Sequence, residues 1–295
     1  MAEGVRGFVG TLVRGVSLTK TPVWQAGRMR LDDFITALPK LWPGQEGATA
    51  DLPDERIHAE MLRATSGMAS ENKLAVLNLA AKHLDAGEIY LEAGAWRGTS
   101  ICAAALGNPD RRFVSVDNFS QFGGPRQECE ANIEQWADGN VELHDSDFWS
   151  FLKQRPLHAP VGVYFYDAGH EFWDQWRALD VIEPFLADEA LIMVDDASWK
   201  FVAAADAAFV ESHPRFEFLR RFPMDSPNGL RWWNGLDLIS YRRALPEADP
   251  AQVRDSHRAA LLRYGLAYRG FDLTRALVRD KIGSRAKAAA RSVLH

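Results

Sequence analysis

Residues 88–100, EIYLEAGAWRGTS, decide the fold. The first five residues are mostly aliphatic and aromatic, which is typical of a short strand. Gly94 and Gly98 follow, and glycine lets the backbone turn tightly and approach a ligand closely. Small residues then predict a helix over residues 100–106, which Thr99 and Ser100 could help to cap. A strand, a glycine turn and a helix in direct succession indicate an α/β fold with a binding loop.

Beyond this loop, short predicted strands alternate with predicted helices along the chain. We predict strands at residues 88–92, 112–117, 141–144, 161–166, 190–194, 215–222 and 236–241. Helices are predicted at residues 54–66, from Ser70 onward, and at 126–137, 147–154, 171–186 and 198–212. This alternation predicts a Rossmann-like, doubly wound sheet that is mostly parallel, with helices on both faces.

Two extensions flank the predicted α/β domain, residues 65–245. Residues 1–64 form an N-terminal helical or irregular extension that contains a turn-rich linker, PGQEGATADLP, at 43–53. Residues 246–295 form a basic helical tail, in which positions 251–295 hold ten Lys or Arg against three Asp. One apolar stripe could include Phe271, Leu273, Ala276, Leu277 and Ile282. We expect this tail to dock on its own acidic body or on a second subunit in a homo-oligomer, in preference to an anionic membrane surface.

Composition narrows the class of protein. Apolar residues make up 47% and charged residues 25%, which is ordinary for a globular chain. The net charge is −6, and because the tail is basic the remaining body is strongly acidic, which argues against a nucleic-acid partner. Two cysteines, Cys102 and Cys129, make neither a disulfide framework nor a metal-ligand spacing. With no apolar run near the ~18 residues of a membrane span, we expect a cytoplasmic protein.

Acidic residues end three of the predicted strands: Asp117, Asp167 and Asp195. In a doubly wound sheet the ligand lies in the crevice at that edge. Asp117, about twenty residues beyond the loop, suits the ribose of an adenosine, whether from a nicotinamide cofactor or another nucleoside. Glu92 occupies the first glycine position of a diphosphate-binding loop, where its charge would repel a diphosphate. An acid there favours a cationic ligand.

With Glu92, Gly94 and Gly98 in place, the chain resembles the class I S-adenosylmethionine-dependent methyltransferases over about residues 65–242. Trp96 replaces the middle glycine of the family loop, as in a subgroup that reads E-x-G-x-x-x-G-x-S and includes metal-dependent sugar and macrolide O-methyltransferases. The resemblance implies a seven-stranded sheet whose last strand is antiparallel. It also implies S-adenosylmethionine as cofactor, bound by the loop residues Glu92, Gly94, Trp96, Gly98, Thr99 and Ser100, and by Asp117.

The resemblance also implies an adenine site after the third strand. There an acid accepts a hydrogen bond from the adenine amino group, and an apolar neighbour packs on the ring. Asp147 and Phe148 fit these roles, with Asp145 as a rival for the acid. Asp147 could instead be only the N-cap of the helix that begins at Phe148.

Asp167, Asp195 and Asp196 form the candidate metal site. Adjacent parallel strands lie roughly 4.8 Å apart, so carboxylates at their ends converge and repel one another unless a cation lies among them. Oxygen ligands favour Mg²⁺, Mn²⁺ or Ca²⁺. The resembling subgroup carries D-x-x-H and then a D-D pair, which implies these three acids as ligands, with Mg²⁺ the expected ion. His170 can act as general base near neutral pH, or cap the next helix.

Aromatic residues mark the connection between the last two strands, PMDSPNGLRWWNG at residues 223–235. In the fold that the resemblance implies, this connection passes near the active site. Trp232 and Trp233 could stack on a sugar or an aromatic acceptor, and Asn228 and Arg231 could bind its oxygens. Either tryptophan could instead only cover the sheet edge.

The expected function is therefore metal-assisted O-methylation of a hydroxyl on a small molecule or sugar-containing metabolite. A nicotinamide-dependent oxidoreductase would explain the loop and Asp117, but not Glu92 or the acidic cluster. A non-catalytic docking module would be expected to have lost the loop or the base. A metal-dependent hydrolase is a weaker alternative, since water could use the same acids and histidine.

Overall fold

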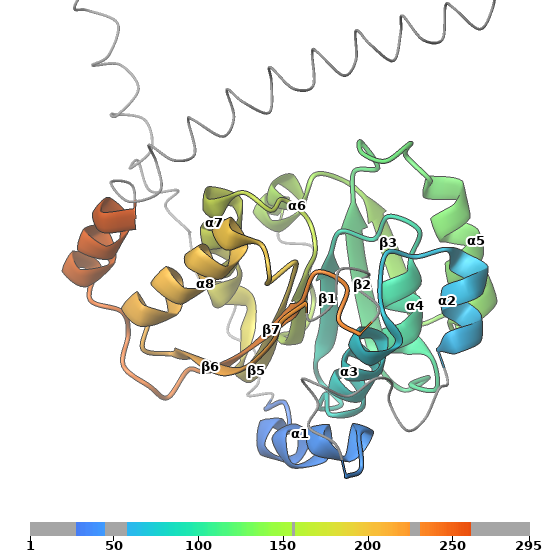
Figure 1. Cartoon of the computed structure of the whole chain (residues 1–295), viewed down its shortest axis with the longest axis horizontal. Helices are drawn as coiled ribbons and strands as arrows, with labels where there is room; N and C mark the ends of the chain where they lie inside the picture. The colour runs from blue at the N-terminus through green and yellow to red at the C-terminus, as the bar shows by residue number, and fades with distance from the viewer. Residues whose placement is uncertain (1–27, 45–57, 155–156, 225–230, 261–295) are drawn as a thin grey trace, which may run out of the picture.

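A seven-stranded mixed sheet forms the centre of the protein (Figure 1). The computed structural model describes residues 28–44, 58–154, 157–224 and 231–260. The strand order is β3-β2-β1-β4-β5-β7-β6, and only β7 runs antiparallel to its neighbours. The strands are β1 Ile89–Ala93, β2 Arg112–Asp117, β3 Val141–Asp145, β4 Val161–Tyr166, β5 Leu186–Asp195, β6 Phe216–Phe222 and β7 Leu236–Arg242. This architecture confirms the predicted Rossmann-like sheet with an antiparallel last strand.

Helices cover both faces of the sheet, each burying its own apolar core (Figure 1). One face carries α1 Leu31–Ala37, η1 Leu38–Leu41, α2 Ala59–Thr65, α3 Glu71–Lys82, α4 Thr99–Ala105 and α5 Arg126–Trp136. The other carries α6 Phe148–Gln154, α7 Phe172–Ile182, η2 Glu183–Phe185 and α8 Lys200–Ser212. Because strand side chains alternate between faces, odd-numbered residues of β5 from Leu191 to Asp195 point toward α3.

Most predicted boundaries hold within two residues, and the different start of β5 has a local cause. Residues 54–57 of the helix predicted at 54–66 lie outside the described residues, and α2 is Ala59–Thr65. Strand β5 begins at Leu186, four residues before the predicted start, because α7 ends at Ile182 and Pro184 lies in the short helical turn that follows. The expected capping of α4 by Thr99 or Ser100 is wrong. The N-cap is Gly98, in a left-handed conformation with φ 78°, and no side chain caps this helix.

The flanking segments pack on the sheet domain wherever the structure describes them. Phe34 and Trp42 are buried in the same core as α3, and Arg28 forms an isolated parallel β-bridge with Glu189 of β5. Residues 250–260 are helical, and His257 contacts Trp173 of α7 with ring centroids 4.5 Å apart. The predicted apolar stripe of the tail lies outside the described residues. No helix in the described ranges is long and apolar enough to cross a membrane.

Candidate functional site

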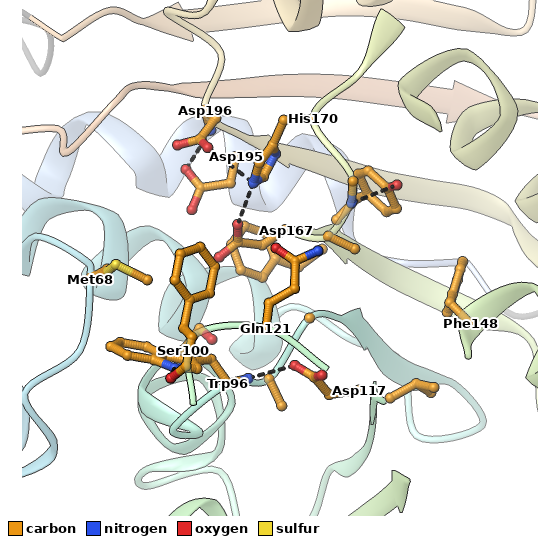
Figure 2. A pocket seen from close by; sticks show the side chains of 18 of the residues that line it. Met68, Trp96, Ser100, Asp117, Gln121, Phe148, Asp167, His170, Asp195 and Asp196 are labelled. Carbon is orange, nitrogen blue, oxygen red and sulfur yellow. Dashed lines mark hydrogen bonds and ion pairs between the residues drawn. The ribbon is translucent and has the colours of Figure 1, made fainter. Parts of the chain in front are cut away.

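A cavity of about 450 Å³ opens at the carboxyl edge of the sheet, where the ends of β1, β2, β4 and β5 meet. Figure 2 shows two groups of side chains in it. We call one group the loop end, formed by Gly94, Trp96, Thr99, Ser100, Asp117, Asp147 and Phe148. We call the other the acid end, formed by Lys73, Asp167, His170, Asp195, Asp196 and Trp233. The sheet topology thus brings most of the predicted site residues into one cavity.

Gly94 and Asp117 set the shape of the loop end. Gly94 has φ 99°, and a Cβ added there would lie 1.9 Å from the backbone oxygen of Asp167, so only glycine fits. The Trp96 amide donates to Asp117 Oδ2 at 2.8 Å, and the Phe119 amide donates to Oδ1 at 2.6 Å. Two backbone donors therefore fix the Asp117 carboxylate in the cavity wall (Figure 2).

Glu92 lies beneath the loop and does not line the cavity. Its side chain is fully buried, because this residue of β1 points toward α4, and Ser115 Oγ donates to its Oε2 at 2.5 Å. Its other oxygen, Oε1, has no hydrogen-bond partner among the described residues. Burial raises the pKa of Glu92 to about 7. Glu92 can therefore attract a cationic ligand only electrostatically, through the loop that separates them, and not by direct contact.

The structure distinguishes the two candidate acids after β3. Asp145 is exposed, forms an ion pair with Arg126 at 2.7 Å and does not line the cavity. Asp147 lines the cavity, and its Oδ2 accepts from the Ser150 amide at 2.9 Å, as the N-cap of a helix does. Phe148 lines the cavity beside it and stacks on Tyr164 with ring centroids 5.9 Å apart. Asp147 therefore caps α6 and also faces the cavity.

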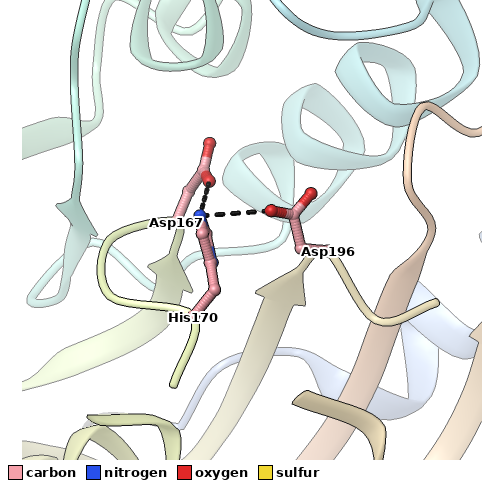
Figure 3. Close-up of side chains that lie close together, drawn as sticks. All are labelled: Asp167, His170 and Asp196. Atoms are coloured by element: carbon pink, nitrogen blue, oxygen red, sulfur yellow. Dashed lines mark ion pairs between the residues drawn. The ribbon is translucent and has the colours of Figure 1, made fainter. Parts of the chain in front are cut away.

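At the acid end, Asp167, His170 and Asp196 come together (Figure 3). Each offers one ligand atom, and these three atoms lie within 4.8 Å of one another. His170 Nε2 lies 3.1 Å from Asp196 Oδ2 and 3.9 Å from Asp167 Oδ1. Burial, together with the nearby carboxylate of Asp195, raises the pKa of both Asp167 and Asp196. A bound cation would reduce the repulsion between these neighbouring carboxylates.

Asp195 lines the cavity beside these three residues, and it has a partner that the sequence did not predict. Lys73 of α3 is buried, and its Nζ donates to Asp195 Oδ1 and, at 3.0 Å, to the backbone oxygen of Trp233. Nothing near Lys73 in the sequence signals this pairing, since a lysine in a helix usually faces solvent.

The connection between β6 and β7 leaves the sheet beside Asp195, as expected, because Phe222 pairs with Leu236, which in turn pairs with Asp195. Its two tryptophans have different environments. Trp232 is fully buried and stacks on Phe222 at 4.0 Å between centroids, whereas Trp233 lines the cavity. Arg231 does not line the cavity, and Asn228 lies outside the described residues.

The mouth of the cavity carries aromatic and apolar side chains that the sequence analysis did not single out. Phe122 is 69% exposed and Trp199 46% exposed, and both line the cavity, as does Met68. Trp199 also contacts the His170 ring edge-on, with centroids 5.3 Å apart. Their positions in loops carry no periodic signal, so only the fold brings them to the site.

Comparisons with known proteins agree with this architecture. Residues 91–197, from β1 to just beyond β5, match the family model described as a methyltransferase domain. No curated protein matches the chain. An O-methyltransferase from Bacillus cereus, solved in complex with SAH, is 14% identical with a TM-score of 0.51, covering 71% of this chain and 97% of its own.

Two further solved structures also match the chain. The cofactor-bound Rv0187 from MTB is 19% identical with a TM-score of 0.49, covering 74% of this chain and 99% of its own. TomG from Streptomyces achromogenes, an O-methyltransferase solved with SAM, is 17% identical with a TM-score of 0.49, covering 71% of this chain and 96% of its own. The family match shows that residues 91–197 contain a methyltransferase domain, and the sheet order agrees with the fold predicted for it.

Proposed function

We propose that this enzyme is an O-methyltransferase that acts, with the help of a divalent cation, on a hydroxyl of a small molecule or sugar-containing metabolite. One observation carries the proposal: Asp167, His170 and Asp196 lie together in the same cavity as the fixed carboxylate of Asp117. A site for an adenosine-bearing cofactor thus adjoins a site able to activate a hydroxyl. The similar Bacillus cereus structure is of an O-methyltransferase, which agrees with this choice of acceptor atom.

In this proposal the loop end holds S-adenosylmethionine. Asp117 accepts hydrogen bonds from the ribose hydroxyls, since its carboxylate retains lone pairs beyond those used by the two backbone amides. Asp147 and Phe148 hold the adenine, and Gly94 lets the backbone approach the cofactor. Gly98 does not line the cavity and is the N-cap of α4. Glu92 favours the cationic cofactor from beneath the loop, through the ionised form of its buried carboxyl.

The acid end fits a hard divalent cation. Asp167 and Asp196 present carboxylate oxygens to one point, and Mg²⁺ is commonly held by one or two carboxylates together with substrate oxygens. A bound divalent cation would supply Lewis acidity that lowers the pKa of an acceptor hydroxyl.

His170 is the general base in this proposal. Its Nε2 could bind a cation or accept a proton, but a single lone pair cannot do both. We assign the base role because Mg²⁺ prefers oxygen to imidazole nitrogen. Asp196, 3.1 Å away, orients the ring and stabilises the imidazolium that forms when His170 takes the proton. The deprotonated acceptor oxygen then attacks the methyl group of the sulfonium, and S-adenosylhomocysteine leaves.

The acceptor lies against Trp233 and the apolar side chains at the mouth, Phe122 and Trp199. Flat apolar faces of this kind stack on sugar rings and on aromatic rings. Trp232 has no part in this contact, since it belongs to the core. The acceptor site therefore contains one tryptophan of the predicted pair, Trp233, and two residues from other loops, Phe122 and Trp199.

Methylation of a metabolite extract with isotope-labelled S-adenosylmethionine tests the proposal, with products identified by mass spectrometry. We expect a labelled methyl ether, its loss after chelation with EDTA, and recovery with Mg²⁺. Full turnover after exhaustive chelation would remove the cation, and a label on nitrogen or carbon would remove O-methylation. Thermal stabilisation by a nicotinamide cofactor but not by S-adenosylmethionine would favour an oxidoreductase instead.

A further inference from the structure

Two turns of the chain pack against each other beside the acid end. One follows β5 and is closed by the Trp199 amide, which donates to the backbone oxygen of Asp196 at 2.8 Å. The other precedes β7 and is closed by the Gly235 amide, which donates to the backbone oxygen of Trp232 at 2.7 Å. The cavity-lining tryptophans Trp199 and Trp233 therefore lie on two different turns.

Ser198 joins these two turns. Its amide donates to the backbone oxygen of Asn234 at 2.8 Å, and its Oγ accepts from the Met224 amide at 2.7 Å. The turns approach closely, because a Cβ added to Gly235 would lie 2.5 Å from Ser198 Oγ. The position of each turn thus depends on the other turn as well as on its own strand.

Asn234 connects this junction to the candidate cation site. It lines the cavity, and its side-chain amide donates a hydrogen bond to the Asp196 carboxylate. Burial and the neighbouring Asp195 raise the pKa of Asp196, and the bond from Asn234 opposes them because it favours the ionised carboxylate. A carboxylate offers about four lone-pair sites. Asp196 can therefore contact Asn234, His170 and a cation at the same time.

The backbone conformation restricts which residue can make this bond. Asp196 has φ 56° and Asn234 has φ 57°. Few side chains favour this left-handed region, which is populated mainly by glycine, asparagine and aspartate. Glycine would fit the backbone at position 234 without strain, but it could not donate to Asp196. Asparagine suits both the backbone and the hydrogen bond.

We propose that Asn234 is a positioning residue: its side-chain amide holds the Asp196 carboxylate toward the cation site, and its backbone oxygen joins the two turns that carry Trp199 and Trp233. The inference rests on the cation of the proposed function, for which Asp196 is a ligand. Groups that orient a ligand carboxylate commonly contribute about ten- to a hundredfold to metal affinity, because they hold the ligand in place before the ion arrives.

Binding of Mn²⁺ to the full-length protein, measured by electron paramagnetic resonance without cofactor or acceptor, tests this inference. N234G removes the side-chain donor and places a residue that suits the left-handed backbone. We expect its Mn²⁺ dissociation constant to rise by about tenfold or more. The dissociation constant for S-adenosylmethionine, measured by calorimetry, should stay within about twofold of wild type, because the side chain of Asn234 contacts Asp196 at the acid end.

S66G is the matched control. Ser66 also has a left-handed backbone, with φ 50°, but it ends α2 outside the cavity, so S66G should change neither constant. A smaller rise for Mn²⁺ in N234G would overturn the inference, since Asp196 would then be held without Asn234.

Equal losses of Mn²⁺ and S-adenosylmethionine binding in N234G, or failure of this variant to fold, would mark Asn234 as structural and overturn the inference as well. If wild type does not bind Mn²⁺, the cation of the proposed function fails and the inference falls with it. If wild type and N234G bind Mn²⁺ equally well, only the inference fails.

Discussion

The loop end and the acid end of the cavity lie side by side but are built differently. The loop end comes from residues 94–148, and each contributing residue ends a strand, lies in the loop that follows it or lies in the first turn of the next helix. The acid end joins β4 and β5 to Lys73 and Trp233, which lie 160 positions apart in the chain. At the loop end, a residue lines the cavity because it lies near the carboxyl end of a strand. At the acid end, a residue from a distant helix, Lys73, pairs with one of the strand-end carboxylates, Asp195.

Replacing His170 gives the largest difference between the two ends. His170→Ala should lower kcat by about 10²–10⁴, because it removes the general base. The dissociation constant for S-adenosylmethionine should stay within about twofold of wild type, since His170 is confined to the acid end. Mn²⁺ binding, measured in parallel, separates base from ligand. Loss of that binding would show that His170 holds the cation.

Trp232 lies in the core and Trp233 in the cavity wall, so replacing each should have a different effect. Trp232→Ala should lower the free energy of unfolding by about 3–5 kcal/mol, since it empties a fully buried site against Phe222 and Trp42. Trp233→Ala should instead raise the acceptor KM several-fold with a smaller loss of stability, because the side chain lines the cavity. Urea denaturation and steady-state kinetics on both variants check this. Equal stability losses and unchanged kinetics would mark both residues as structural.

Buried acids near the two ends of β1 provide a pH test. Burial raises the pKa of Glu88 and of Glu92 to about 7. Each folded-state carboxyl keeps its proton where the unfolded chain has lost it, so its stabilising contribution is complete below about pH 4.5 and is lost as pH rises to 7. The expected loss is about 3 kcal/mol per residue. The free energy of unfolding, measured by urea denaturation from pH 4.5 to 8, should depend less on pH in Glu88→Gln and in Glu92→Gln than in wild type. Each variant should lose the contribution of one carboxyl.

Cofactor binding separates these two acids. A cationic cofactor above the loop favours ionised Glu92, so affinity for S-adenosylmethionine should rise with pH toward 7 in wild type and in Glu88→Gln. In Glu92→Gln the rise should disappear. A rise that persists in Glu92→Gln would show that Glu92 does not act on the cofactor.

The sequence predicted the sheet well because its strands are short apolar runs set between helices. The bounds of β2 and β4 match the prediction at both ends, and the strand-end acids Asp117 and Asp167 lie in the cavity as the topology requires. Local pattern could not reveal Lys73, whose partner lies 122 positions away. Nor could it separate Trp232 from Trp233, since only packing against Phe222 and Trp42 places the first in the core.

Calorimetric titration of the protein with S-adenosylmethionine, beside the Asp117→Ala variant, tests whether this cavity binds the cofactor. We expect one site per chain in wild type. In the variant we expect a loss of about 2 kcal/mol or more, which is roughly thirtyfold in the dissociation constant, because charge-assisted hydrogen bonds to the ribose are removed. Asp145→Ala, which alters the exposed acid outside the cavity, is the control and should bind as wild type does. Absence of binding in wild type, or equal affinity in Asp117→Ala, would contradict the assignment of this cavity to the cofactor.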